Sequence, residues 1–444
     1  MKIKNGTFFF AQLHKIPYFC NPITERRNMK IRITPPESIH ATIQLPASKS
    51  ISNRALIIHA LAKGSHRPEN LSDCDDTQVM IRALKAKEGE TINIQAAGTA
   101  MRFLTAYFSI TPGTRILTGT ERMKQRPIGI LVDALRQLGA DIEYVENEGF
   151  PPLRITGSKL TKNHITLPGN VSSQYISALL MIGPALENGL NITLTGDIVS
   201  RPYINMTLQL MNDFGAKASW QDEHELKVEP QAYTPVPFHV ESDWSAASYW
   251  YQIVSLSKDA QVTLPGLFKH SYQGDSKVAE YFQLLCASTT FKEESACLHT
   301  AHWSAEVQPE SMALDLTHQP DLAQTIVVTC ALQNIKFRIS GLQSLKIKET
   351  DRMAALICEM KKLGYVLHEA EGSILYWNGE RCERSHEAID TYEDHRMAMA
   401  FAPVSLVQGE ITIAHPEVVS KSYPSYWEHL RQAGFIITEN ESAC

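Results

Sequence analysis

Apolar residues recur at helical spacing along the chain and predict two alternating series of helices. The first series is apolar on one face, and a short strand follows each helix; its members span residues 77–94, 128–144, 203–220, 277–291, 351–367 and 424–437. The second series is apolar on nearly every side, as buried helices are, and spans residues 50–62, 99–110, 173–186, 244–256, 322–332 and 395–407. Four helices of the first series end in predicted glycine C-caps, at Gly139, Gly215, Gly364 and Gly434.

This alternation predicts an internal repeat. The buried helices begin roughly 50–80 residues apart, which is the spacing of a large repeated unit. Six buried and six surface helices predict six copies of the unit, most simply three in each of two domains. The length of 444 residues agrees, because such a chain usually folds as two or three domains.

Composition narrows the class of protein. The chain has 42 Lys and Arg against 48 Asp and Glu, and this net charge of −6 disfavours a broad nucleic-acid-binding surface. A mean hydropathy of −0.19, without a long apolar run, disfavours a membrane span. The eight cysteines are scattered without a CxxC pair, which favours reduced thiols in the cytoplasm over disulfides or a zinc site.

The first 28 residues form a separate segment. Their apolar patch is too short for a signal peptide, and His14 and Lys15 interrupt it. A second start-like segment at residues 29–33 opens the first alternating strand. We therefore expect residues 1–28 to be a dispensable extension.

Polar and charged residues concentrate at the predicted N-termini of the buried helices, namely Lys49-Ser50, Gly98-Thr99, Ser172-Ser173-Gln174, Asp243, Asp321 and Asp394-His395-Arg396. Unpaired N–H groups and the helix dipole make such ends suitable for binding anions. Ordinary capping is the alternative, because Ser, Thr and Asp are favoured N-caps. Capping does not explain the cations that lie at the same ends: Lys49, Arg54, Arg102 and Arg396.

Two segments of the first half add candidate groups. Arg126 precedes a proline at a helix entrance, where a plain surface arginine is the alternative. Ser200 and Tyr203 place hydroxyls before a surface helix, and capping is again the alternative. Gly98 is expected to permit close approach of a ligand to the backbone.

The second half carries acids beside its cations. Lys348, Glu349 and Arg352 fall within about one helical turn. This run is either a salt-bridged helix face or a proton donor placed beside a bound anion. Asp321 is either a simple N-cap or a general base. Lys421 completes the set of candidates.

Six ordered motifs together resemble a known family. PASKSISNRALI, AGTAMRFL, RPIGILVDAL, GNVSSQYISALL, KETDRMAAL and EDHRMAMAF are closely similar to those of the EPSP synthase (3-phosphoshikimate 1-carboxyvinyltransferase) family of enolpyruvyl transferases. The resemblance implies an α/β fold of two domains, each with three βαβαββ repeats around buried helices, an inverse α/β barrel. We expect an N-terminal domain of residues 48–241, a C-terminal domain of residues 30–47 plus 242–440, and hinges near residues 46–48 and 240–243.

The resemblance also implies a reaction. The enolpyruvyl group of phosphoenolpyruvate would pass to the 5-hydroxyl of shikimate 3-phosphate through a tetrahedral intermediate, releasing phosphate in the shikimate pathway to chorismate and aromatic amino acids, with no metal or cofactor. The expected partners are these two small molecules, without nucleic acid or membrane, for a monomeric cytoplasmic enzyme. Eight cations from both halves would offset the repulsion between the two anions as the domains close and expel water.

The family's functional positions map onto this sequence. Phosphoenolpyruvate would be held by Lys49, Gly98, Arg126, Gln174, Arg352, Arg396 and Lys421. Shikimate 3-phosphate would be held by Lys49, Ser50, Arg54, Ser172, Ser173, Gln174, Ser200, Asp321, Ser344 and Lys348. The catalytic residues would be Lys49, Asp321, which accepts the hydroxyl proton, and Glu349, which protonates the methylene carbon.

Departures from the family pattern bear on affinity. Ala96 and Phe103 replace a common asparagine and proline, and Ser344 stands where an asparagine often contacts the sugar-like ligand. One alternative function is UDP-N-acetylglucosamine enolpyruvyl transfer, which is disfavoured because no loop cysteine occurs between Cys74 and Cys286. The other is a non-catalytic anion-binding relative, which predicts the loss of Asp321 or Glu349, and both acids are present.

Overall fold

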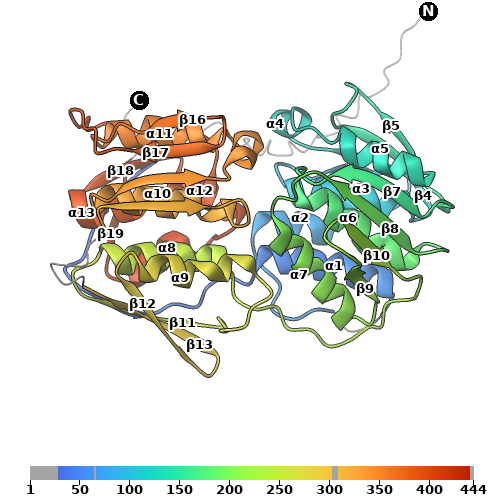
Figure 1. Ribbon diagram of the computed structural model, residues 1–444, viewed down its shortest axis with the longest axis horizontal. Coiled ribbons are helices and arrows are strands. Elements are labelled where there is room, and N and C mark those ends of the chain that lie inside the picture. The colour runs from blue at the N-terminus through green and yellow to red at the C-terminus, as the bar shows by residue number, and fades with distance from the viewer. Residues whose placement is uncertain (1–28, 65–66, 303–308, 441–444) are drawn as a thin grey trace, which may run out of the picture.

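The computed structural model describes residues 29–64, 67–302 and 309–440, which form two lobes side by side (Figure 1). Each lobe has its own cluster of buried apolar residues. The first lobe's cluster draws on residues 47–240, and the second lobe's cluster draws on residues 31–45 together with residues 244–435. The expected extension, residues 1–28, lies outside the described residues.

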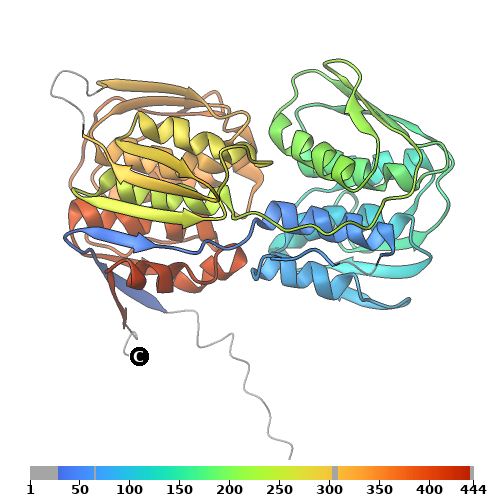
Figure 2. The same cartoon turned by 90° about the horizontal axis from the view of Figure 1, so that it is seen from below.

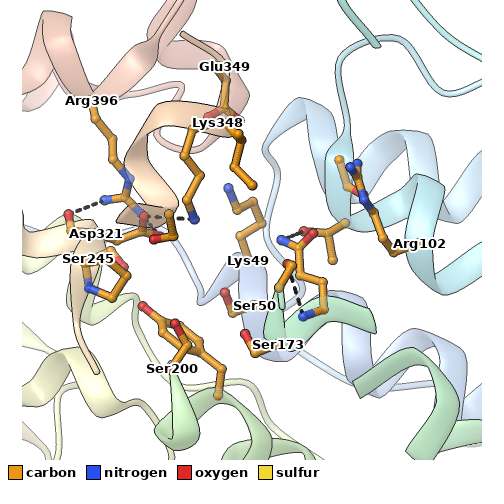
Figure 3. A pocket seen from close by; sticks show the side chains of 18 of the residues that line it. Lys49, Ser50, Arg102, Ser173, Ser200, Ser245, Asp321, Lys348, Glu349 and Arg396 are labelled. Atoms are coloured by element: carbon orange, nitrogen blue, oxygen red, sulfur yellow. Dashed lines mark hydrogen bonds and ion pairs between the residues drawn. The ribbon is translucent and has the colours of Figure 1, made fainter. Parts of the chain in front are cut away.

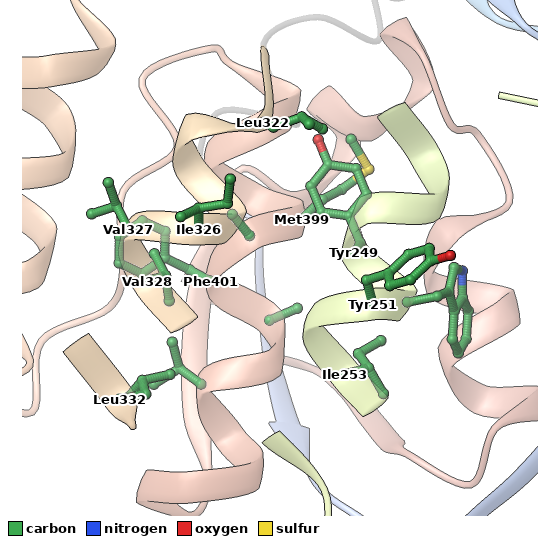
Figure 4. Packing of buried hydrophobic residues seen from close by; sticks show 14 of the residues in the cluster. Tyr249, Tyr251, Ile253, Leu322, Ile326, Val327, Val328, Leu332, Met399 and Phe401 are labelled. Atoms are coloured by element: carbon green, nitrogen blue, oxygen red, sulfur yellow. The ribbon is translucent and has the colours of Figure 1, made fainter. Parts of the chain in front are cut away.

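Buried helices occupy the centre of both lobes. The three helices of the first lobe contact one another, namely α1 (Lys49–Ala62), α3 (Gly98–Ser109) and α6 (Ser173–Ile182). The second lobe repeats this arrangement with α8 (Trp244–Leu256), α10 (Ala323–Leu332) and α12 (His395–Phe401), whose apolar side chains interlock (Figure 4). Short 3₁₀ segments extend three of them: η2 (Gly183–Ala185), η4 (Pro320–Leu322) and η6 (Ala402–Val404), the last followed by α13 (Ser405–Gln408). The second series of predicted helices is therefore confirmed.

Amphipathic helices of the first series lie outside these bundles. These six helices are α2 (Asp75–Ala83), α5 (Gly129–Leu138), α7 (Arg201–Asp213), α9 (Val278–Gln283), α11 (Arg352–Lys362) and α14 (Tyr426–Gln432). The short helix α4 (Glu121–Lys124) was not among the predicted elements. The 3₁₀ segments η3 (Gly274–Lys277), η5 (Gln343–Ile347) and η7 (Pro416–Lys421) lie beside them in the chain. The predicted cap glycines have positive φ angles, from 79° at Gly215 to 109° at Gly139, as helix ends require.

Four sheets of the described residues share one topology. Each has one parallel pair of strands and two antiparallel pairings. In the first lobe they contain β3 (Thr91–Asn93), β4 (Gly113–Thr118), β6 (Leu153–Gly157) and β5 (Asp141–Tyr144), then β7 (His164–Pro168), β8 (Leu190–Thr195), β10 (Glu225–Val228) and β9 (Ala218–Trp220). In the second lobe they contain β12 (Ala287–Lys292), β13 (Ser295–Thr300), β11 (Ala260–Pro265) and β2 (Ile39–Thr42), then β14 (Ser311–Asp315), β15 (Lys336–Ser340), β17 (Ile374–Trp377) and β16 (His368–Ala370).

The remaining two copies are less regular. One forms a three-stranded antiparallel sheet of β18 (Ile411–Ala414), β1 (Lys30–Thr34) and β19 (Ile436–Asn440), with a parallel bridge between Ile389 and Ile413. The other, in the first lobe, shows among the described residues only a bridge between Glu69 and His239. The segment before His239 contains Pro230, Pro235 and Pro237, which lack the N–H that a strand ladder needs.

Two segments of chain cross between the lobes (Figure 2). Ala47 and Ser242 form an antiparallel bridge, and Ser48 N donates to Glu241 O at 2.8 Å. Asp243 N donates to Pro46 O at 2.9 Å. The crossing segments therefore run as a pair, and β1 and β2 belong to sheets of the second lobe. Within the described part of the chain, no helix is both long and apolar enough to cross a membrane.

Candidate active site

A cavity between the lobes is lined by the N-termini of all six buried helices. The first lobe supplies Lys49 and Ser50 of α1, Gly98 and Thr99 of α3, and Ser173 and Gln174 of α6. The second lobe supplies Ser245 of α8, Asp321 just before α10, and Arg396 of α12 (Figure 3). The polar helix ends singled out in the sequence therefore converge on one cavity.

The candidate residues predicted from the sequence come together in this cavity. Its lining includes Lys49, Ser50, Arg54, Gly98, Arg126, Ser172, Ser173, Gln174, Ser200, Asp321, Ser344, Lys348, Glu349, Arg352 and Arg396. Lys421 lies behind this lining, where Nζ is 3.0 Å from Glu349 Oε1. Seven cations in the lining, together with Lys421, concentrate positive charge within an acidic protein.

Asp321 is held by cations of the second lobe. Arg352 Nη1 donates to Asp321 Oδ1 at 3.0 Å, and Arg396 Nη2 donates to Oδ2 at 2.9 Å. Lys348 Nζ lies 3.5 Å from Oδ1. Burial by itself would raise the pKa of Asp321, but the charges of Arg396, Lys348 and Arg352 outweigh it and hold the pKa well below its ordinary value. The carboxylate is therefore ionised and able to accept a proton.

Glu349 joins cations from both lobes. Arg352 Nη2 donates to Glu349 Oε2 at 2.8 Å, while Lys421 Nζ and Arg126 Nη1 lie 3.0 Å and 3.8 Å from Oε1. Burial would raise the pKa of Glu349, but Lys421, Arg352 and Arg126 hold it well below its ordinary value. Arg122 of the first lobe donates to the carbonyl oxygens of Lys348 and Glu349 at 3.3 Å and 3.0 Å, which fixes this backbone across the interface.

Arg352 connects the acids of the second lobe. Its side chain is 2% exposed, and Nε donates to Asp394 Oδ2 at 2.6 Å, in addition to the bonds to Asp321 and Glu349. Burial lowers the pKa of Arg352, but Asp394, Glu349 and Asp321 raise it further, so the net shift is upward. The alternative of a salt-bridged helix face is therefore partly correct for residues 348–352, but this face is buried at the cavity.

Lys49 contacts acids at the starts of two other helices. Its Nζ lies 3.6 Å from Asp76 Oδ2, and its backbone N donates to Asp243 Oδ2 at 3.1 Å. Asp243 Oδ1 also accepts from Ala246 N at 3.0 Å, so this carboxylate caps α8 while it holds the start of α1. Burial lowers the pKa of Lys49, but Asp76, Cys74 and Glu349 together outweigh burial and the net shift is upward, which keeps the amine protonated.

Arg54 and Arg102 are held by neutral groups. Arg54 donates to Thr207 Oγ1 at 2.7 Å, Ser177 Oγ at 3.2 Å and Ser50 O at 2.9 Å. Arg102 donates to backbone carbonyl oxygens at positions 98 and 127, at 3.1 Å and 3.2 Å. Burial lowers the pKa of both guanidinium groups to about 10, and both stay charged near neutral pH.

Capping accounts for some of the hydroxyls but not for all of them. Ser48 Oγ accepts from Ile51 N, and Ser172 Oγ accepts from Gln174 N, both at 3.4 Å. Ser172 therefore caps α6 as well as lining the cavity. Ser50, Ser173 and Ser200 also line the cavity without serving as side-chain caps in this part of the chain (Figure 3).

The structure gives a physical role to three positions singled out in the sequence, at residues 96, 98 and 103. A Cβ at position 98 would lie 2.7 Å from Arg126 Nη1, so Gly98 also makes room for the Arg126 guanidinium, and the approach of a ligand to this backbone stays a prediction. Lys421 Nζ donates to the carbonyl oxygen of Ala96 at 2.8 Å, which any residue there would supply. Phe103 packs under Arg54, with 5.2 Å from Cζ to the ring centroid.

Sequence reasoning missed three residues of this site. Asp76 pairs with Lys49, Tyr249 OH accepts from Arg396 Nη1 at 3.4 Å, and Asp275 accepts from Tyr203 OH at 2.7 Å. Asp76 lies in an acidic run at the start of a surface helix, and Tyr249 lies within an apolar helix. Neither pattern differs locally from an ordinary helix end or core position.

Comparison with known proteins gives a consistent result. The family model described as EPSP synthase (3-phosphoshikimate 1-carboxyvinyltransferase) matches residues 33–92 and 85–430. The chain is 64% identical over 414 residues to 3-phosphoshikimate 1-carboxyvinyltransferase of Bacteroides fragilis, covering 93% of this chain and 100% of the relative. It is 37% identical over 430 residues to the Vibrio cholerae protein of the same name, covering 90% and 99% of the two chains.

A solved structure supports the fold. The 2.37 Å structure of EPSP synthase from Acinetobacter baumannii superposes with a TM-score of 0.73 at 21% identity, covering 93% of this chain and 100% of that chain. At 21% identity the superposition supports the two-domain fold and nothing more specific. The family model and the long, highly identical relatives are independent of it. This chain therefore belongs to the EPSP synthase (3-phosphoshikimate 1-carboxyvinyltransferase) family.

Proposed function

We propose that the protein transfers the enolpyruvyl group of phosphoenolpyruvate to the 5-hydroxyl of shikimate 3-phosphate and releases phosphate. One observation carries the proposal: cations of both lobes converge on a single cavity that also holds two ionised carboxylates, Asp321 and Glu349. Two multiply charged anions repel each other strongly at contact distance, so a site that joins them needs this concentration of charge.

The two ends of the cavity suit different ligands. The hydroxyl-rich wall would hold shikimate 3-phosphate through Lys49, Ser50, Arg54, Ser172, Ser173, Gln174, Ser200, Asp321, Ser344 and Lys348. The cation cluster around Glu349 would hold phosphoenolpyruvate through Lys49, Gly98, Arg126, Gln174, Arg352, Arg396 and Lys421. Gln174 fits between the two, because its Nε2 donates to Thr99 Oγ1 at 3.2 Å and so fixes the amide at the cavity wall.

Proton transfers follow from the state of the two acids. Asp321 is ionised and would accept the proton of the 5-hydroxyl as its oxygen attacks the central carbon of phosphoenolpyruvate. Glu349 would deliver a proton to the methylene carbon, which yields the tetrahedral intermediate. The charges of Lys421, Arg352 and Arg126 hold the pKa of Glu349 well below its ordinary value, which keeps it ionised. An anionic ligand would compete for these cations, raise the pKa of Glu349 and favour its protonation.

The cavity needs both lobes. We propose that residues 48–241 and residues 30–47 plus 242–440 move as two domains about hinges near 46–48 and 240–243. Contacts of Glu349 with Arg126 and of Lys421 with the Ala96 carbonyl join the lobes and are expected only in the closed state. The expectation of a monomeric cytoplasmic enzyme remains part of the proposal, and light scattering after size exclusion tests the oligomeric state.

Phosphate release from the purified protein tests the function. We expect turnover with phosphoenolpyruvate and shikimate 3-phosphate together, and none with either substrate alone. UDP-N-acetylglucosamine in place of shikimate 3-phosphate is expected to give no turnover. Lys49→Ala is expected to lower turnover by about two orders of magnitude or more, because it removes a charge from the ligand site. It is also expected to lower thermal stability, because the buried Asp76 carboxylate loses its ionic partner. A folded wild-type protein that released no phosphate would contradict the proposal.

A further inference from the structure

A buried carboxylate outside the predicted set lies where the lobes meet. Asp275 of η3 is 2% exposed, and its side chain does not line the cavity. Its Oδ1 accepts from the Tyr203 hydroxyl of the first lobe at 2.7 Å, and its Oδ2 accepts from the Ser245 hydroxyl of the second lobe. Tyr203 and Ser245 both line the cavity, so this acid stands directly behind two residues of its wall (Figure 3 shows Ser245).

The same stretch of wall has other fixed points in the second lobe. Ser200 has a left-handed backbone, with φ at 55°, and its N–H donates to Thr317 O at 3.1 Å. A Cβ at Gly274 would lie 2.4 Å from Pro202 Cβ, so η3 approaches the start of α7 as closely as a glycine allows. The second lobe therefore holds residues 200–203 at three points, and Asp275 provides the contact at Tyr203.

Placing an acid here has an electrostatic cost. Burial first, and then the charge of Asp321, raise the pKa of Asp275 to about 6, against the opposing effects of Ser245, Arg396 and Tyr203. A carboxylate that only filled space would be replaced at less cost by an amide or an apolar residue. Its two acceptor oxygens match two hydroxyls that lie on opposite lobes.

We propose that Asp275 is a positioning residue that binds the Tyr203 and Ser245 hydroxyls across the interface and thereby sets the wall at residues 200–203 against Asp321 when the lobes close. The ligand affected is shikimate 3-phosphate, since Ser200 and Asp321 lie on its side of the cavity. This inference rests on the proposed function for the identity of that ligand.

The interface supplies a matched control. Tyr272 OH of the second lobe donates to Asp213 Oδ2 of the first lobe at 2.7 Å. This Tyr–Asp pair also joins the lobes, but Asp213 is exposed, Tyr272 is only half-buried, and neither residue lines the cavity. Tyr272→Phe therefore removes an interface hydrogen bond of the same kind without touching the wall.

Titration calorimetry with shikimate 3-phosphate and steady-state kinetics test the proposal on Tyr203→Phe, Asp275→Asn, the double variant and Tyr272→Phe. We expect each of the first two to raise Kd and KM for shikimate 3-phosphate about tenfold with a smaller change in kcat. The double variant should be within about twofold of the worse single variant, because both changes break one interaction. Tyr272→Phe should stay within about twofold of wild type.

Three results would overturn the inference. Equal effects of Tyr203→Phe and Tyr272→Phe would show a general interface contact, and effects that multiply in the double variant would show that Tyr203 acts independently of Asp275. Lower melting temperatures with unchanged Kd and KM would show a purely structural role. A wild-type protein that binds shikimate 3-phosphate but releases no phosphate would reject the proposed function, while the Kd values would still decide the role of Asp275.

Discussion

Two pairs of arginines, one pair on each wall of the cavity, hold their positive charge in different ways. In the first lobe, Arg54 and Arg102 donate mainly to hydroxyls and backbone carbonyl oxygens, and burial lowers their pKa to about 10. In the second lobe, Arg352 and Arg396 donate to carboxylates, which outweigh burial and raise their pKa. The same residue type thus has opposite electrostatic surroundings on opposite sides of one cavity.

This difference separates binding from proton transfer. A cation bonded to neutral groups offers its charge to a ligand without giving up an ionic partner. A cation paired with a carboxylate exchanges that partner when an anion arrives, and the carboxylate is then freer to take up a proton. We therefore expect Arg54 and Arg102 of the first lobe to act chiefly in binding, and the acids paired with Arg352 and Arg396 of the second lobe to act chiefly in catalysis.

The largest effect is expected from Glu349→Gln. This change keeps the side chain's size but removes the carboxyl group, so kcat should fall about 10²–10⁴-fold. KM for phosphoenolpyruvate should not rise, because Lys421 and Arg126 lose a competing negative charge. Phosphate-release kinetics measure both. Glu369→Gln is the control, since Glu369 pairs with Lys346 outside the cavity, and it should leave kcat within about twofold. An unchanged kcat in Glu349→Gln would contradict the catalytic role that we propose for the acids of the second lobe.

The next largest effect is expected on the free energy of unfolding, which an arginine substitution should lower more in the second lobe than in the first. Arg352→Met leaves Asp394, which is 0% exposed, without its partner, and breaking a buried pair costs about 3–5 kcal/mol. Arg54→Met removes hydrogen bonds to neutral groups, and the loss should be about 1–3 kcal/mol. Urea unfolding of both variants gives the free energies. Equal losses would mean that the walls do not differ in how they hold charge.

Acid should act on the second lobe in two opposite ways. The nearby cations hold the pKa of Asp321 and Glu349 below ordinary values in spite of burial, so their stabilisation is complete above pH about 4 and is lost as pH falls below it. Burial and Asp321 raise the pKa of Asp275 to about 6, so this group adds stability as pH falls from about 6 to about 4. Urea unfolding from pH 7 to 3 should show the second effect in wild type, and Asp275→Asn should lack it.

The smallest effect is expected at Ala96. Lys421 binds the backbone carbonyl at this position and not the side chain, which is exposed. Ala96→Asn should therefore change KM for phosphoenolpyruvate by less than about twofold. Ser344→Asn is the contrast, because Ser344 Oγ is buried in the cavity lining without a hydrogen-bond partner among the described residues. A larger change in KM for Ala96→Asn than for Ser344→Asn would contradict this prediction.

Helices were more predictable than sheets. The helix expected at residues 244–256 is α8 (Trp244–Leu256), because an uninterrupted apolar pattern and the Asp243 cap are both local signals. The strand expected at the end of the segment 351–367 lies just beyond that segment, because β16 begins at His368. The poorly formed sheet of the first lobe was not foreseen, because a repeat count does not show which copy carries prolines at a strand position.

The sequence by itself determined the buried helices and the cations at their N-termini, because periodicity, capping and motif spacing are properties of neighbouring residues. It also carried the family resemblance. Only the tertiary structure decided the partner of each charge: Asp321 for Arg352 and Arg396, Glu349 for Lys421, and Asp275 for the Tyr203 hydroxyl. These pairs join residues that are mostly far apart in the chain: the first three form where helix ends of the second lobe meet in space, and the last forms across the interface between the lobes.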